Sequence, residues 1–308
     1  MSQRYKPPHL AFVGAAHVEG PKGCQAVLFG APHGTPYPLI NNRVHEDTPQ
    51  ALRAALAEDA HWKNHWDFDL GGTLDGGRDF RFGDLGDIRT LPDDGPGNRN
   101  LIGQTTTEIL DAGAVPIMIG GDDSTPIPFI AAFSKHGPLT ILQIDAHIDW
   151  REERRGERYG FSSTMRRASE MGHVQTIIHA GTRALGSARE ADVMAARNWG
   201  AHIITARQIL AEGVAPVLNL IPQGANVLIT FDCDALDGSI MPAVISPTPG
   251  GLTYWHILDL IAGVSQRGRI AGLDLIEFVP ERDHANQSAA YLAGRILVFA
   301  AGTIARTV

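Results

Sequence analysis

Three acidic clusters carry most of the chemistry that this sequence could perform. They are Gly120–Ser124, Asp145–Asp149 and Asp232–Asp234, and each follows directly on a short apolar run. The three runs are Val115–Ile119, Leu139–Ile144 and Val227–Phe231. Carboxylates so close to buried segments cost much free energy unless a positive group pairs with them. Because no Lys or Arg lies inside any cluster, the sequence predicts divalent metal ions as the counter-charges.

The spacing inside two of the clusters favours a shared metal site. Asp145, His147 and Asp149 are two residues apart, and so are Asp232 and Asp234. Residues two apart in an extended chain point to the same side, so each cluster can direct its ligand atoms at one place. A single metal could not use all of these groups. Two metals, typically ~3.5–4 Å apart and joined by bridging carboxylates, could use them and would lower the pKa of a bridging water.

The ligand types also constrain the metal. The predicted ligands are Asp123, Asp145, His147, Asp149, Asp232 and Asp234. This set is mostly oxygen, with one imidazole and no sulfur. It suits Mn, and less often Ni, Co or Fe, rather than structural zinc.

Strand-like and helix-like segments alternate along the chain around these clusters. Further apolar runs predict strands at Gln25–Phe29, Gln175–His179, His202–Thr205 and Ile270–Ile276. Helical patterns cover Thr48–Asp59, Arg99–Gly113, Pro126–His136, Ala188–Trp199, Ala206–Leu210, Tyr254–Val264 and Asn286–Ala301. By contrast, the Gly/Asp-rich segment Leu70–Asp87 is predicted to be a long loop, and the charged Arg151–Arg158 a solvated one.

This rhythm predicts an α/β fold in which helices cover both faces of a parallel sheet. The sequence shows no internal repeat and no linker, so a single domain over residues 1–308 is expected. In parallel sheets, ligands bind beyond the carboxyl ends of the strands. Three strands that each end in acidic residues can therefore converge on one crevice.

Composition excludes several classes of function. The chain of 308 residues has a formal net charge of −8, which gives nucleic acid no basic face to bind. With two cysteines, Cys24 and Cys233, a disulfide framework is excluded and a reducing cytosol is expected. No run is long enough for a membrane span, and no signal peptide is visible at the N-terminus. A cytoplasmic enzyme is the resulting prediction.

Three ordered motifs carry a resemblance to a known family. They are GGDDS at 120–124, QIDAHIDW at 143–150 and TFDCDALDGSIMPA at 230–243, and GGLTYW follows at 250–255. They are similar to the signatures GGDHS, DAHxD and SFDxDxxDPxxAP of the ureohydrolases, the family of arginase and agmatinase. The resemblance runs from about Leu28 to Pro280 and is strongest to the agmatinase-like branch.

The resemblance implies a fold and a reaction. The implied fold is a three-layer α/β/α domain with a mainly parallel sheet of about eight strands. The implied reaction is hydrolysis of a small cationic guanidino compound to an amine and urea, by hydroxide that bridges two Mn²⁺ ions, with Ni²⁺ as the alternative metal. Candidate substrates are agmatine, 4-guanidinobutyrate, 3-guanidinopropionate, guanidine itself and a biguanide. Family members form trimers or hexamers, so a homo-oligomer is expected, with a hetero-oligomer as the alternative.

The resemblance also assigns roles by position. Asp145, His147, Asp149, Asp232 and Asp234 match family metal ligands. Glu277 matches the carboxylate that pairs with the guanidinium, and a planar guanidinium suits bidentate contact with a carboxylate. The predicted catalytic residues are Asp149 and Glu277. The predicted substrate-binding residues are Glu277, Ser162, Ser163 and Arg183.

The chain departs from the family pattern at three places. Asp123 stands where the family has a metal-binding His, which replaces a neutral ligand by an anion and is expected to reduce the Lewis acidity of the nearby metal. Gly238 replaces a Pro of the third motif. The agmatinase-like branch also has a His shortly after the second motif, where Arg158–Met165 has none and Ser162 or Ser163 takes its place.

Two alternatives remain at the level of sequence. One is a single-zinc amide deacetylase, which can share this kind of fold and an Asp-x-His ligand pair, although the additional carboxylates disfavour it. The other is a catalytically weak partner subunit, which the departures at Asp123 and Ser162 would explain. An early loop with His33 and Asn41–His45 could cap the crevice of its own or of a neighbouring subunit.

Overall fold

Alternating apolar positions along the strands explain why helices cover both faces of the sheet. In the computed structural model, which describes residues 4–307, strand β3 (Ala26–Ala31) sends Leu28 into one hydrophobic core and Phe29 into the other. Strand β9 (Asn226–Asp232) does the same with Ile229 and Leu228. Successive side chains of a strand point to opposite faces, so continuous apolar runs require cover on both sides.

The sheet has ten strands in the described part of the chain, in the order β1-β4-β3-β5-β10-β9-β6-β7-β8, with β2 beside β4. All pairs are parallel except β1 with β4. The remaining strands are β1 (Tyr5–Lys6), β2 (Ala16–His17), β4 (Phe82–Ile88), β5 (Val115–Gly120), β6 (Leu139–Ile144), β7 (Val174–Thr182), β8 (His202–Thr205) and β10 (Arg269–Ile276). Since β1 and β2 have only two residues each, the eight longer strands agree with the predicted sheet of about eight.

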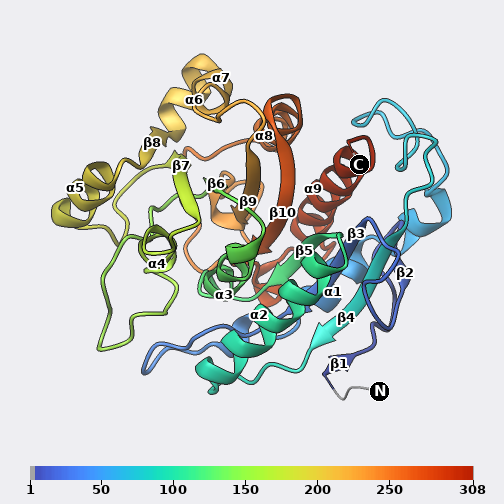
Figure 1. Ribbon diagram of the computed structural model, residues 1–308, viewed down its shortest axis with the longest axis horizontal. Coiled ribbons are helices and arrows are strands. Elements are labelled where there is room, and N and C mark those ends of the chain that lie inside the picture. Colours follow the sequence, from blue (N-terminus) through green and yellow to red (C-terminus); the bar gives the residue numbers. More distant parts are fainter. Residues whose placement is uncertain (1–3, 308) are drawn as a thin grey trace.

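Helices form a layer on each face of the sheet, as the α/β/α prediction requires (Figure 1). One layer contains α1 (Thr48–Ala55), α6 (Ala206–Glu212), α7 (Ala215–Leu218), α8 (Tyr254–Arg267) and α9 (Ser288–Ala305). The other contains α2 (Gly95–Asp111), α3 (Pro126–Ala131), α4 (Thr164–Ser169) and α5 (Glu190–Trp199). Short 3₁₀ helices are η1 (Arg43–His45), η2 (Glu58–Trp62), η3 (Ala132–Lys135), η4 (Cys233–Ala235) and η5 (Pro280–Arg282). The predicted helices and strands are thus present, with ends shifted by a few residues.

Helix α9 is the one helix of residues 4–307 that is long and apolar enough to cross a membrane. However, 78% of its apolar window is buried within the fold. It packs against α1 and α8 and is therefore the core helix of the first layer.

The predicted loop Leu70–Asp87 is wrong at its end, because β4 begins at Phe82. The Gly/Asp composition disfavours a strand, but Arg53 on α1 compensates the charge of Asp84, which is buried on β4. Its Nε and Nη2 lie 2.8 and 2.9 Å from the two carboxylate oxygens of Asp84, and its Nη1 lies 2.6 Å from Asp87. Gly86 has φ +79°, and a Cβ there would lie 2.2 Å from the carbonyl oxygen of Lys6. A tertiary partner from another segment thus overrides the local sequence.

Asp274 is a second buried acid within the sheet, and it predicts that the stability of the fold depends on pH. Asp274 on β10 is fully buried and accepts a hydrogen bond from Thr230 Oγ1 at 2.7 Å. Burial raises the pKa of Asp274 to about 8, and the bond from Thr230 only partly opposes the shift. The unfolded chain has a pKa near ~3.9 at this position. The folded state therefore binds the proton more tightly, and stability from this group falls as the pH rises from about 4 to 8.

Asp274→Asn is expected to remove that dependence. The melting temperature of the variant should rise relative to the parent between pH 5 and pH 8, with a stability slope of at most ~1.4 kcal/mol per pH unit. Calorimetric melts across this range would measure the difference. Asp259→Asn, at an exposed position of α8, is the control and should give none. A parent-to-variant difference that stays constant over the range would contradict the assignment.

Candidate metal centre

Four neighbouring strands end at one edge of the sheet, and each brings an acidic group to that edge. In spatial order, β5 leads to Asp123, β10 to Glu277, β9 ends in Asp232 and β6 leads to Asp145. The carboxyl ends of parallel strands are the usual place for a ligand site in such sheets. The strand order thus brings the three sequence clusters together, as their positions predicted.

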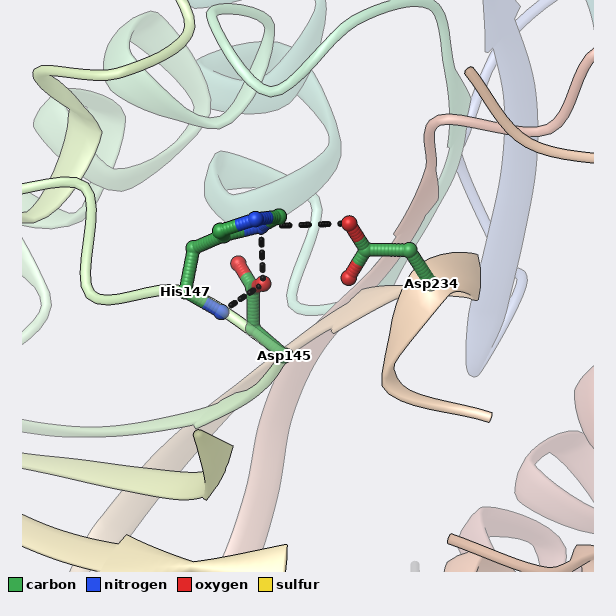
Figure 2. Close-up of side chains that lie close together, drawn as sticks. All are labelled: Asp145, His147 and Asp234. Atoms are coloured by element: carbon green, nitrogen blue, oxygen red, sulfur yellow. Dashed lines mark hydrogen bonds and ion pairs between the residues drawn. The ribbon is translucent and has the colours of Figure 1, made fainter. Parts of the chain in front are cut away.

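One group of candidate ligands joins the second and third clusters (Figure 2). The imidazole Nδ1 of His147 lies 3.3 Å from Asp145 Oδ1 and 3.1 Å from Asp234 Oδ2. One ligand atom from each of these three residues lies within 4.8 Å of the other two. Backbone amides fix the carboxylates: His147 N donates to Asp145 Oδ1 at 2.6 Å, and Ala146 N donates to Asp234 Oδ1 at 3.2 Å.

A second group consists of Asp123, Asp145 and Asp149, again with one ligand atom each inside 4.8 Å. Asp145 belongs to both groups, so its carboxylate lies between two positions that could each hold a cation. Gln143 Nε2 donates to Asp145 Oδ2 and to Asp149 Oδ2, both at 2.7 Å. These bonds orient two of the three carboxylates, as outer hydrogen-bond partners do in metal sites.

Asp232 lies beside the two groups without belonging to either. Its Oδ1 accepts a hydrogen bond from Asp234 N at 2.7 Å, and its side chain is 3% exposed. It lines the same cavity as Asp123, Asp149 and Asp234. The structure therefore brings all six predicted metal ligands to one place.

The electrostatics of this centre call for a cation. Burial, followed by the charges of Asp149 and Asp145, raises the pKa of Asp123. Burial likewise raises the pKa of Asp149 and of Asp232, with neighbouring carboxylates adding to it. Burial lowers the pKa of His147, but hydrogen bonds and charges from Asp145 and Asp234 outweigh it and raise the pKa to about 12. The centre thus attracts a proton to its one imidazole in the absence of another cation.

The donor set also fits metal ions on geometric grounds. Both carboxylate oxygens of Asp123 are buried and have no hydrogen-bond partner within residues 4–307. An unpaired buried carboxylate is strongly unfavourable, so these two oxygens are left for a ligand outside the chain. The ion pairs of the described chain bring only His147 and His45 to the centre. Oxygen-rich donors with one imidazole suit the divalent cations predicted from the sequence.

Glu277 lies at the same edge, with its carboxylate held from two sides. Its Oε1 accepts a hydrogen bond from Asp123 N at 2.9 Å, and His45 Nε2 lies 3.5 Å from its Oε2. Its backbone has φ +63°, and that of Asp149 has φ +41°. Positive φ is unfavourable for residues other than glycine and persists where the surroundings impose it, often at functional sites. Both predicted catalytic residues therefore have strained backbones.

These groups line a cavity of about 300 Å³. The acidic wall consists of Asp123, His147, Asp149, Asp232, Asp234 and Glu277. Ser162 also lines the cavity, and its Oγ lies 2.7 Å from the hydroxyl of Tyr37. Ser163 does not line it, and its buried Oγ has no partner in the described chain. Of the two serines predicted to contact substrate, the structure places Ser162 in position to do so.

Arg183 lines a cavity that adjoins the acidic one, and backbone carbonyls hold its guanidinium. Its Nη2 donates to the carbonyl oxygens of Asp234, Leu236 and Thr248 at 2.7, 3.0 and 2.9 Å. It is absent from the lining of the acidic cavity. The sequence could not show that nearby backbone carbonyls take up the guanidinium, and contact of Arg183 with a substrate stays a prediction.

Sequence reasoning missed two residues of the site. Gln143 was passed over inside an apolar run, although a polar residue two before Asp145 was a signal, since both point to the same side of β6. Gln143 Oε1 accepts from the buried His179 Nδ1, which sets the direction of the amide. His45 was placed only in a loop that could cap the crevice. It is 1% exposed, and its Nδ1 lies 2.9 Å from the carbonyl oxygen of Phe278.

Fold and site together define an α/β protein with carboxylate groups able to hold metal ions at the end of a parallel sheet. A model of the Arginase family matches residues 24–302, and the chain belongs to this family. This confirms the resemblance seen in the three motifs.

Individual relatives carry several names. The chain is 32% identical over 197 residues to N(1)-aminopropylagmatine ureohydrolase of Thermus thermophilus. The matched region covers 63% of this chain and 66%, just under two thirds, of that protein. It is 30% identical over 189 residues to guanidinobutyrase of Pseudomonas aeruginosa, with 59% of each chain covered. The solved structure of proclavaminate amidino hydrolase from Streptomyces clavuligerus has a TM-score of 0.84 at 26% identity and covers 100% of both chains.

Proposed function

We propose that this protein is a metal-dependent hydrolase that releases urea from a small guanidino compound. One observation carries the proposal: two ligand groups share Asp145, and their other members line a cavity that also contains Glu277. The names of its relatives, a ureohydrolase of aminopropylagmatine, a guanidinobutyrase and an amidino hydrolase, support the reaction type.

The residues of the centre would hold two divalent cations. Asp123, Asp145 and Asp149 would hold one, and Asp145, His147 and Asp234 the other. Asp232 is the further ligand beside both. When bound, such a pair polarises the substrate and lowers the pKa of a water to the neutral range.

Glu277 supplies recognition of the substrate in this proposal. A guanidinium presents a planar fork of N–H donors, which a carboxylate accepts through both oxygens. Asp123 N and His45 hold the Glu277 carboxylate in place for that contact. Asp149, which lines the cavity beside the substrate, takes the proton that the attacking water loses. Ser162, whose hydroxyl lines the same cavity and lies 2.7 Å from the Tyr37 hydroxyl, would relay that proton from Asp149 to the leaving amine.

Release of urea is the direct test. Apo-protein loaded with Mn²⁺, and separately with Ni²⁺, would be assayed with guanidine, a biguanide, agmatine and guanidinobutyrate. Urea that depends on the metal and disappears with a chelator is expected. Two metal ions per chain in the active preparation would exclude the single-zinc deacetylase. No urea from any of these compounds would refute the proposed function and favour the partner-subunit alternative.

Mn²⁺ is the proposed resident metal, and Asp123 is the residue that tests the choice. Asp123→His replaces a carboxylate by an imidazole, which suits Ni more than Mn. The affinity ratio of Ni²⁺ to Mn²⁺ should therefore rise by about tenfold or more. Competition titrations with metal analysis would measure the ratio. Asp122→Asn is the matched control, because its carboxylate bonds to Ser124 and belongs to neither ligand group. An unchanged ratio in Asp123→His would mean that Asp123 does not ligate.

We also propose that the protein works in the cytoplasm as an oligomer, a homotrimer or homohexamer. Both cysteines are free in the structure, which suits a reducing compartment. Light scattering of the purified protein would measure the assembly, and a second, different subunit that co-purifies with it would favour the hetero-oligomer.

A further inference from the structure

We infer that the substrate of this cavity has a guanidinium head and an uncharged tail, in contrast to agmatine, which carries an amine, and to guanidinobutyrate, which carries a carboxylate. The inference rests on the proposed function and concerns the part of the cavity beyond the acidic centre. Two observations support it. The side chains that form this outer wall of the cavity are uncharged, and the nearby arginines are already paired with other groups.

The cavity has a charged end and an uncharged end. The charged end is the acidic centre, where Asp232 is 3% and Glu277 is 8% exposed. The other end opens to solvent, where Ile245 is 40% and Leu185 is 100% exposed. The remaining residues that line the cavity are all uncharged: Phe161, Ser162, Leu185, Gly186, Ser187, Val244, Ile245, Ser246 and Thr248. A head group that binds Glu277 would direct its tail along these apolar groups and hydroxyls.

Arginines lie close to this wall, but their guanidinium groups are directed elsewhere. Arg282 Nη1 donates to the carbonyl oxygens of Val244, at 2.9 Å, and Ile245. Arg183 Nη2 donates to the carbonyl of Thr248, at 2.9 Å, from the other end of the same loop. The two arginines thus fix the loop by its backbone and leave its uncharged side chains to line the cavity.

A third arginine is shielded from the cavity by an aromatic ring. Arg154 Cζ lies 5.2 Å from the ring centroid of Tyr37 and 5.8 Å from that of Phe161. Phe161 lines the cavity and Arg154 does not. The guanidinium is therefore engaged with the two ring faces.

An adjoining cavity of about 400 Å³ offers no free charged partner to the tail of a substrate. It shares His147, Leu185, Gly186 and Ser187 with the first cavity. Its charged lining residues are His147 and Arg183, and all three guanidinium nitrogens of Arg183 already donate to backbone carbonyls. A longer tail that entered this space would again meet mostly apolar groups, such as Ile148 and Val193.

The physical consequence is a penalty on charged tails. A charged tail that lies against this wall loses the part of its hydration that the wall displaces, and no opposite charge on the wall compensates for that loss. An uncharged tail gains from the same contacts through the apolar area it buries. An ammonium tail receives no carboxylate from this wall, and a carboxylate tail receives no free guanidinium.

The experiment compares guanidines that share a four-carbon chain. Urea release by the metal-loaded enzyme would be measured with butylguanidine, 4-hydroxybutylguanidine, agmatine and 4-guanidinobutyrate. We expect kcat/KM for the two uncharged compounds to exceed that for both charged ones by about tenfold or more. Calorimetric titration of the metal-free protein with the same four compounds should give the same order of affinities, and without metal ions the preference is read without turnover.

Substitutions at the outer wall test the cause. Ser246→Asp, which introduces a carboxylate, should shift the preference towards agmatine, and Thr248→Lys should shift it towards 4-guanidinobutyrate. Ser246→Asn is the matched control and should keep the parent order. Equal or higher kcat/KM for either charged compound in the parent enzyme would overturn the inference while leaving the proposed function intact. Absence of urea from all four, together with absence of binding, would overturn both.

Discussion

Asp145→Asn is expected to reduce urea release by at least ~10³-fold and to lower the metal content below one ion per chain. Asp145 is the residue shared by both ligand groups, so its replacement weakens two positions at once. Metal ions that polarise substrate and activate water contribute several kcal/mol to a hydrolysis, and each ~1.4 kcal/mol is a factor of ten in rate. Steady-state rates and metal analysis after dialysis would measure both effects.

The fold should survive this substitution, which makes the result interpretable. Asn keeps the size of the side chain and one oxygen for the hydrogen bond from His147 N. Far-ultraviolet circular dichroism should match the parent. Asp259→Asn on the exposed side of α8 serves as the control and should keep both ions and full activity. A variant at Asp145 that retains two ions would show that the carboxylate does not lie between them.

Glu277→Gln is expected to separate substrate recognition from metal binding. The amide keeps an oxygen for the bond from Asp123 N but loses the negative charge that we propose pairs with a guanidinium. A charge-assisted bidentate contact is about twice as strong as a neutral one, so kcat/KM should fall by roughly 10²–10³-fold. Both metal ions should remain, because Glu277 belongs to neither ligand group.

The separation itself is the decisive measurement for Glu277. Metal analysis should give the parent stoichiometry while the affinity for a guanidinium inhibitor, read by titration, falls with kcat/KM. Glu281→Gln, an exposed position four residues further on, is the control and should behave as the parent. Loss of a metal ion, or unchanged inhibitor affinity, would assign Glu277 a role other than pairing with the substrate.

The positions of these residues could be predicted because their signal is local. Parallel strands with both faces buried give unbroken apolar runs, and acids directly after such runs must lie at the carboxyl edge of the sheet. That reasoning placed Asp123, Asp145 and Asp232 at one edge, where the structure has them. It could not supply the strand order, which sets which acids are neighbours.

Residues whose partners are distant in sequence were beyond such reasoning. β4 was missed because Arg53, 31 residues away from Asp84, compensates its buried acid. The partners of Arg183 could not be predicted, because they are backbone carbonyls of another segment, and every residue has a carbonyl. His45 and Glu277 are 232 residues apart, and neither sits in a motif that points to the other. Tertiary contacts of this kind have no pattern along the chain.

The strand order has a consequence for how the protein is made. β10 is the last strand of the chain, yet it lies between β5 and β9 and leads to Glu277. Until the ribosome has released that segment, β5 and β9 have no common neighbour, and Asp123 is not held beside the other acids. In the proposed two-metal centre, we therefore expect the position that uses Asp123 to be completed late in biosynthesis, after insertion of β10. A nascent chain that ends before residue 269 carries every predicted ligand in its sequence, but it lacks the strand that holds Asp123 beside Asp145 and Asp149.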